Sequence, residues 1–425
     1  MPRACLLCLP LLLASLSWAV EHPALPLSVS ATQLDSLKQG LAPLLALPEA
    51  DLLKLVPTQS GLYFVGCLNC QAGMQEGQLS EWDWHSPDQV KCKFCGQVYP
   101  REKYPLTGVT EVKTPNGSLA KYPYCEVNPS WYSGKEPYRS YFPARVDYHR
   151  ARFMERAARD FAYAYKLSGD SAYGCRAALI LARFAEVFPG YAFHYDYPFQ
   201  QKVLLEGLPA TTATYGEYRT SRWTWWAYLD ISQSLLEAYD LLANGGELGK
   251  LSAEQGRDVP AAVEGMFTDM VTQVLRNRDD LTNMSPGMWA DFIRAGRVLG
   301  KPEYVHIAVS RLRRMMTEMF FYDGSWMEGA PSYHSQVVGS VQAVLQVARG
   351  YSDPVGYQDP ATGERFDALD LATQMPEVGR AQAALERMKL PSGRYLPVHD
   401  TWATASGTPP PAESKPKITI APPPP

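Results

Sequence analysis

The chain has 425 residues, of which 46% are hydrophobic, so it can bury a sizeable core and form roughly two to four domains. Its formal net charge of −4 excludes a protein that binds nucleic acid through an overall positive charge. An acidic ligand remains compatible with this composition if lysine and arginine gather in one cleft. The arginines of 145–159 and 311–314 are available for that, although such runs are also typical of solvated helix faces.

The first 19 residues have the pattern of a secretory signal peptide. Arg3 supplies the positive start, Leu6 to Ala14 form an apolar run, and Ser17 to Ala19 provide a small-x-small cleavage site. The apolar run is too short for a permanent membrane helix, and no other stretch is long and apolar enough to be one. We therefore expect a secreted or periplasmic protein that has no membrane contact after signal cleavage.

The character of the sequence changes near residue 60. Apolar residues at helical spacing between 31 and 56 predict short helices, which are interrupted by Pro43, Pro48 and Pro57. From 61 to 125 the chain contains turn residues, aromatic residues and paired cysteines with little helical period. This segment is therefore expected to be a β-rich module.

Four cysteines of this module form two C-x2-C pairs that are separated by 21 residues: Cys67, Cys70, Cys92 and Cys95. The spacing is typical of a structural zinc site with four thiolate ligands, which leaves no open position for chemistry. Two disulfides are the alternative, favoured by an oxidising compartment. Bridges within C-x2-C pairs are strained and usually redox-active, however. Cys125 and Cys175 either pair with each other or remain buried thiols.

Helical periodicity dominates the region from 126 to 390. Apolar spacing predicts helices over 151–166, 174–188, 223–243, 260–276, 286–299, 303–319, 334–349 and 376–388. Many amphipathic helices without βαβ alternation predict a mainly α domain. A toroid of helical hairpins fits this pattern, and so does a superhelical array, although no repeat of fixed period is found. The low-complexity tail that Pro409–Pro411 and Pro422–Pro425 bracket cannot pack a core.

Two stretches differ from ordinary helix. Asn283 stands just before a helix that Ser285 and Pro286 open, where it can simply cap or turn the chain. The second stretch, D-G-S-W-M-E-G-A-P-S-Y-H, runs from 323 to 334 and also enters a helix. Taken alone, Tyr333 can be a buried aromatic residue, and His334 a satisfied polar group.

Together these stretches resemble the heparinase II/III family of polysaccharide lyases, and the resemblance spans roughly 60–400. In that family the D-G-S…E-G-x-P-S-Y-H stretch carries the catalytic tyrosine, and an upstream Asn or His neutralises the substrate carboxylate. Tyr333 and Asn283 match both positions. The stretch R-W-T-W-W-A-Y over 222–228 resembles the cleft helix, so Trp223 is expected to stack on sugar rings. The cysteine module resembles an insertion in some bacterial members.

The resemblance implies β-elimination on a uronic-acid-containing polysaccharide, with Asn283 neutralising the uronate carboxylate and Tyr333 as general base, acid or both. The cysteine spacing adds a structural zinc ion, and no cofactor is expected for catalysis. Met284 departs from the family pattern, because many members carry histidine there. His399, in L-P-V-H-D, stands where a C-terminal β-sandwich with a catalytic histidine begins; here that domain is expected to be missing or vestigial. His334 and His399 are expected to bind substrate.

The expected organisation follows from these assignments. It comprises a signal peptide at 1–19, N-terminal helices at 20–60, a zinc-knuckle module at 61–125, an incomplete α/α toroid with the catalytic site at 126–390, and the start of a truncated β-domain with a proline-rich tail at 391–425.

Two other functions fit the sequence. An α/α-toroid glycoside hydrolase needs two carboxylates across a cleft. The available acidic residues are Asp196, Glu217, Asp291, Asp323 and Glu328. A non-catalytic glycan-binding protein is the third hypothesis, because of the expected truncation. Both alternatives take a polysaccharide as partner.

Overall fold

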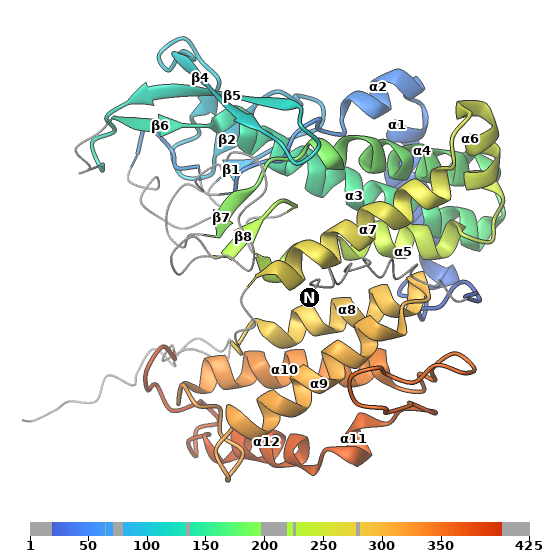
Figure 1. The fold of residues 1–425 in the computed structure, drawn as a ribbon. Coiled ribbons are helices and arrows are strands. Elements are labelled where there is room, and N and C mark those ends of the chain that lie inside the picture. The colour runs from blue at the N-terminus through green and yellow to red at the C-terminus, as the bar shows by residue number, and fades with distance from the viewer. Residues whose placement is uncertain are drawn as a thin grey trace, which may run out of the picture.

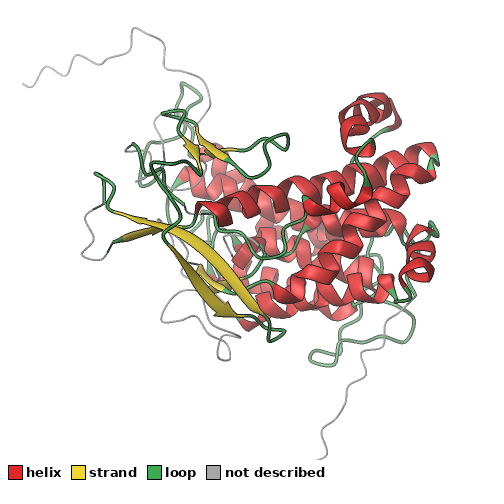
Figure 2. Cartoon of the chain, turned by 90° about the horizontal axis from the view of Figure 1, so that it is seen from above, coloured by secondary structure: helices red, strands yellow, loops and turns green. Residues whose placement is uncertain are grey.

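The computed structural model describes residues 19–63, 65–70, 80–132, 137–196, 219–223, 227–277 and 281–401. Nearly all of the expected signal peptide and of the proline-rich tail lie outside these residues. The described chain is mainly α, as the periodicity predicts. Figures 1 and 2 show the strands gathered at one end of the helical layer. Within the described residues, no helix is both long enough and apolar enough to cross a membrane.

Two short helices follow the N-terminal segment: α1 (Leu34–Leu45) and α2 (Glu49–Lys54), with a 3-10 turn, η1 (Ala31–Gln33), in front. Pro43 lies inside α1, so this proline does not interrupt the helix as expected. It stands in the last turn, where it removes a single backbone donor close to the helix end. Pro48 caps the start of α2, in keeping with the prediction of a break there.

The β-rich part contains two small antiparallel sheets in which consecutive strands pair. The first sheet holds β1 (Ser80–Glu81), β2 (Val90–Cys92) and β3 (Val98–Tyr99). The second holds β4 (Gly108–Lys113), β5 (Leu119–Val127) and β6 (Tyr138–Ser140). Strand pairing therefore continues past residue 125. A separate antiparallel pair is formed by β7 (His194–Asp196) and β8 (Arg219–Ser221), which come later in the sequence, among the helices of the α layer.

Ten further helices within the described residues build the α layer. They are α3 (Phe142–Ser168), α4 (Ser171–Val187), α5 (Gln233–Leu242), α6 (Glu247–Gln255), α7 (Val259–Arg276), α8 (Ser285–Leu299), α9 (Pro302–Glu318), α10 (Pro331–Ala348), α11 (Leu371–Gln374) and α12 (Pro376–Arg387). Helix α3 packs on α4 and α5, and α8 packs on α9 and α10. The starts and stops follow capping rules: Asp170 and Asp258 cap α4 and α7, and Gly169 and Gly300 end α3 and α8 in the left-handed conformation.

The predicted helix over 223–243 begins later than expected. Trp223 follows β8, residues Ala227–Leu229 form a 3-10 turn (η4), and α5 starts at Gln233 behind its cap Ser232. The backbone N–H groups of Arg222 and Trp223 both donate to the Asp230 carboxylate, at 3.0 and 2.6 Å. These bonds hold the described part of the aromatic stretch in a loop, so it is not the cleft helix that the resemblance implied.

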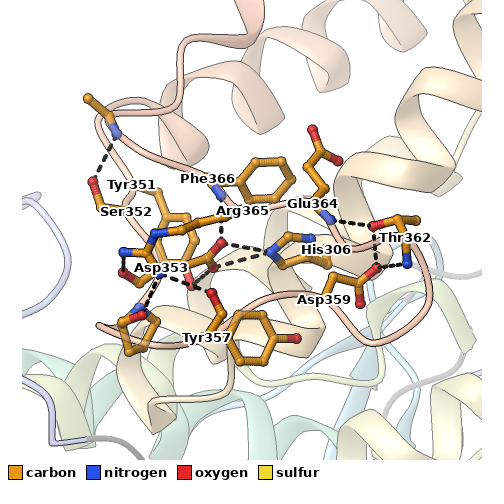
Figure 3. A network of polar contacts seen from close by, with 12 residues as sticks. His306, Tyr351, Ser352, Asp353, Tyr357, Asp359, Thr362, Glu364, Arg365 and Phe366 are labelled. Atoms are coloured by element: carbon orange, nitrogen blue, oxygen red, sulfur yellow. Dashed lines mark hydrogen bonds and ion pairs between the residues drawn. The ribbon is translucent and has the colours of Figure 1, made fainter.

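A buried polar network fixes the long loop between α10 and α11 (Figure 3). Asp353 on this loop accepts hydrogen bonds from His306 Nε2 on α9 at 3.0 Å, from the Tyr351 hydroxyl at 3.0 Å and from the Phe366 N–H at 2.6 Å. The His306 ring also stacks on Phe366, with centroids 4.0 Å apart. Because both His306 and Asp353 are buried and the carboxylate is fully engaged, the network anchors the loop.

Candidate functional site

The motif from 323 to 334 forms a tight turn that leads directly into the first turn of α10. Asp323 accepts hydrogen bonds from the N–H and the hydroxyl of Ser325, at 2.9 and 3.1 Å. The bond from the Ser325 N–H is the main reason that the pKa of Asp323 is lowered. Gly324 has φ +89°, and a Cβ there would collide with the backbone of Arg380, so only glycine fits this turn. Helix α10 then starts at Pro331, which puts Tyr333 in its first turn.

The two expected catalytic residues lie at the starts of α8 and α10, which pack together. Tyr333 is half-buried, and its ring packs against the main core. Asn283 precedes α8, and its Nδ2 donates to Oε1 of Gln336 at 3.3 Å. Gln336 lies one turn after Tyr333, on the same face of α10. Its Nε2 donates in turn to Met284 Sδ at 3.1 Å. Gln336 therefore joins the starts of α8 and α10, a role that no local sequence signal revealed.

His399 approaches the same end of α10. This exposed residue has φ +49°. Its ring lies close to Gly329, because a Cβ added to that glycine would be 3.1 Å from His399 Nε2. The neighbouring residues hold the segment in place. The Ser332 N–H donates to Thr401 Oγ1, and the Ser332 hydroxyl donates to the Asp400 carbonyl, each at 3.1 Å. The segment that carries His399 is thereby docked on the turn that contains Tyr333.

His334 occupies a structural position. Its side chain is buried, with 1% of the residue exposed. Nδ1 accepts from the Trp326 N–H at 3.0 Å, and Nε2 donates to the Ala381 carbonyl at 2.9 Å. Burial lowers the pKa of the imidazole, so the ring is held neutral. With both nitrogens engaged, His334 fastens the turn before α10, and α12, to α10 and has no nitrogen left for the expected substrate contact.

Trp223 is also part of the core. It is 4% exposed, it stacks on Tyr191 with centroids 5.9 Å apart, and its Nε1 donates to Glu155 Oε2 at 3.3 Å. A ring enclosed in this way cannot offer a face to a sugar. The sequence pattern missed this because helical spacing does not distinguish an indole on a cleft wall from one inside the protein.

The acidic residues considered for hydrolysis have internal partners where they are described. Asp291 is buried, Arg294 Nη1 donates to it at 2.8 Å, and burial raises the pKa of Asp291 to about 6. Glu328 accepts from Trp326 Nε1 at 2.8 Å. Glu217 and the side chain of Asp196 lie outside the described residues. The described acidic side chains therefore stabilise local structure.

The four module cysteines converge, with all four Sγ atoms within 4.8 Å of one another. Cys67 lies 3.7 Å from Cys95 and from Cys70, and Cys70 lies 3.9 Å from Cys92. Tetrahedral zinc with Zn–S bonds of ~2.3 Å requires sulfur separations of ~3.8 Å. These four cysteines are therefore close enough together to bind a metal ion.

Local hydrogen bonds favour the thiolate form at Cys95, whereas burial raises the pKa of the Cys67 thiol. The Asn69 N–H and the Tyr99 hydroxyl approach Cys67 Sγ at 3.4 and 3.3 Å. Burial would raise the pKa of the Cys95 thiol, but hydrogen bonds, led by that from the Gln97 N–H, outweigh it and lower the pKa to about 7. Gly96, with φ +70°, forms the knuckle turn after β2.

Cys125 and Cys175 are separate from each other. Cys125 is buried on β5, where it belongs to the small hydrophobic cluster of the module. Cys175 lies on α4 and packs against the main core. Both are free thiols, as are the four clustered cysteines. Of the two possibilities for this pair, the structure has the unpaired one.

Comparison with known proteins gives solved structures only, since neither a family model nor a curated protein matches the chain. Heparan sulfate lyase HepC from Pedobacter heparinus has 14% identity and a TM-score of 0.34 over 60% of this chain and 34% of that one. A HepC mutant gives 14% and 0.36 over 90% and 50%. A heparinase III gene product gives 13% and 0.32 over 58% and 35%. The chain thus spans between a third and a half of their lengths.

Proposed function

We propose that this chain is a polysaccharide lyase that cleaves uronic-acid-containing glycans by β-elimination. The hydrogen bond from Asn283 to Gln336 carries the proposal. It ties the amide expected to bind the substrate carboxylate to the helix that holds the expected base, one turn from Tyr333. The docking of His399 on the first turn of α10 adds a third group of the expected set.

The chemistry needs these residue types. The C5 proton of a uronate is weakly acidic, because the adjacent carboxylate already carries a negative charge. Asn283 gives one Nδ2 hydrogen to Gln336, and the second is available to the substrate carboxylate. A neutral donor aimed at that group stabilises the enolate-like charge that develops as the proton leaves.

The elimination itself moves two electron pairs. A base takes the C5 proton, the C5–H electrons form the C4=C5 double bond, and the C4–O4 bond breaks. An acid then protonates the departing O4. We assign Tyr333 to the base, the acid or both, and His399 to substrate binding beside it. Free tyrosine ionises near pH ~10, so a base role requires a cationic group next to the phenol in the complex.

We assign zinc to the four cysteines as a structural ion. Cys67, Cys70, Cys92 and Cys95 would hold it as thiolates, and four sulfur ligands leave no open position on the metal. Its contribution is to stabilise the module that packs against α3. We further infer that the helical hairpins form an incomplete toroid and that the protein is secreted or periplasmic.

The test is a panel of uronate polymers (alginate, heparan sulfate, chondroitin and hyaluronan) assayed for the ultraviolet absorbance of the unsaturated product. Tyr333→Phe should lose activity by about 100-fold or more, as expected for removal of a general acid or base. Tyr322→Phe is the matched control, because this tyrosine, directly before the turn at 323, is 94% exposed.

The outcomes separate the alternatives. The proposal is contradicted if Tyr333→Phe still eliminates as fast as the wild type. It is also contradicted if the wild type eliminates none of the polymers. New reducing ends without absorbance would indicate a glycoside hydrolase. Binding without any cleavage would indicate the non-catalytic glycan-binding protein.

A further inference from the structure

A second feature of the molecule lies away from α8 and α10. A groove of about 370 Å³ runs between the cysteine module and the first half of α3. Its cationic and indole side chains come from both walls: Lys93, Arg145, Arg152, Arg156, Trp82 and Trp84. The three arginines are spaced at seven and four residues along α3, so they share one face of the helix.

The groove carries an excess of positive charge. Among its described lining residues the only carboxylate is Asp83, which is already hydrogen-bonded to His85 Nδ1 at 2.8 Å. Lys93 and Arg156 are exposed and have no ion-pair partner in the described part of the chain. Arg152 pairs with Glu155, at 2.7 Å. In a chain of net charge −4, this local concentration of cations attracts anions.

Arg145 gives the groove a buried cation. It is 3% exposed, and its guanidinium lies over the rings of Tyr63 and Tyr148, at 4.8 and 5.0 Å from their centroids. Its Nε donates to Ser80 Oγ at 2.8 Å, and its Nη1 donates to the Tyr63 carbonyl. Within the described residues no carboxylate neutralises it. A buried charge without a counter-ion is costly, so a bound anion would be stabilising here.

The indoles supply a rigid apolar wall. Trp82 and Trp84 are half-buried and pack on Phe153, with ring centroids 5.3 and 6.4 Å apart. Trp82 Nε1 also donates to the Pro87 carbonyl at 3.0 Å, which fixes the ring. Trp84, Phe153 and Arg156 additionally line a second hollow of about 570 Å³ beside α1. The two hollows therefore share one wall.

We propose that this groove binds an acidic oligosaccharide, with its carboxylates at the cations and its sugar faces on the indoles. An acidic oligosaccharide carries both anionic groups and apolar ring faces, and the groove offers arginines on α3 for the first and two indoles on the module for the second. The proposal does not require elimination at Tyr333, because no lining residue belongs to α8 or α10.

The experiment is calorimetric titration of Tyr333→Phe protein, in which turnover should be strongly reduced, with a hexamer of mannuronate, a neutral mannose hexamer and a polyaspartate of equal charge. Lys93→Gln combined with Arg156→Gln should weaken mannuronate binding by about tenfold, since two exposed charge contacts are lost. Lys166→Gln, an exposed site in the last turn of α3, is the control and should change nothing. Trp84→Leu should weaken mannuronate binding and leave polyaspartate unaffected.

Three results would overturn the proposal: unchanged mannuronate binding in the double variant, equal binding of the neutral hexamer, or equal effects of Trp84→Leu on both polyanions. The lyase assay is read separately. Loss of binding in the double variant of a chain that never eliminates supports the groove and contradicts the lyase. Elimination together with unchanged binding supports the lyase and contradicts the groove.

Discussion

Replacing Cys92 with serine tests the metal site directly. The thiol is buried on β2, 3.9 Å from Cys70 Sγ, and serine conserves its volume while removing a soft ligand. We expect the wild-type protein to carry one zinc ion per chain, because three of the sulfur separations, at 3.7–3.9 Å, match the edge of a zinc–thiolate tetrahedron and all four sulfurs lie within 4.8 Å of one another. The variant should bind little or none.

The expected magnitude follows from loss of the ion. Structural zinc sites contribute about 10–16 kcal/mol to folding in small zinc-finger peptides, so a variant that no longer holds the ion loses a stabilisation of up to about 10 kcal/mol. Cys125→Ser is the matched control, because Cys125 is buried on β5 in the same hydrophobic cluster but outside the sulfur tetrahedron. This variant should lose some stability because a hydroxyl is buried, and it should still bind zinc.

The assay combines metal content by mass spectrometry with urea unfolding before and after chelation. Wild type and Cys125→Ser should lose stability when zinc is removed, whereas Cys92→Ser should not respond to chelator. Thiol titration of the denatured protein, with and without reductant, distinguishes the disulfide alternative. Four thiols that appear only after reduction, in a protein without zinc, would refute the reasoning.

The remaining predictions concern the polar contacts. Asp353→Ala should lower the free energy of unfolding by about 3–5 kcal/mol, measured by urea titration, because it leaves His306 and the Phe366 N–H buried without their acceptor; a loss below ~1 kcal/mol would contradict the anchoring role. The pKa of Asp291 is raised by burial to about 6, above its unfolded value, so its contribution to stability falls as pH rises from about 4 to 6. Asp291→Asn should therefore gain about 3 kcal/mol relative to wild type between those pH values, and parallel pH profiles would refute this. Gln336→Leu should lower kcat on the uronate polymer that the wild type cleaves and leave the melting temperature unchanged, because the exposed amide positions Asn283 without packing in the core; unchanged kcat would remove Gln336 from the site.

Local sequence patterns were enough to predict most of the α layer. The apolar spacing within 260–276, 286–299 and 303–319 matches α7, α8 and α9 to within a residue at each end, because cap residues and proline at the first turn mark where those helices start. The spacing of the four cysteines likewise predicts their convergence, since each C-x2-C turn directs two sulfurs to the same side. Where a distant side chain competes, local pattern fails: Asp230 holds Arg222 and Trp223 in a loop that the aromatic spacing predicted as helix.

The sequence alone therefore determined which segments are helical, which cysteines meet, and which stretch resembles a catalytic motif. Only the tertiary structure decided the environment of each candidate residue. It encloses Trp223 and His334, joins Asn283 to α10 through Gln336, and sets Lys93 opposite the arginines of α3. The physical reason is that periodicity reports what a residue does along its own helix or strand. Burial, charge balance and hydrogen-bond partners depend on segments that are far apart in the chain and meet only when it folds.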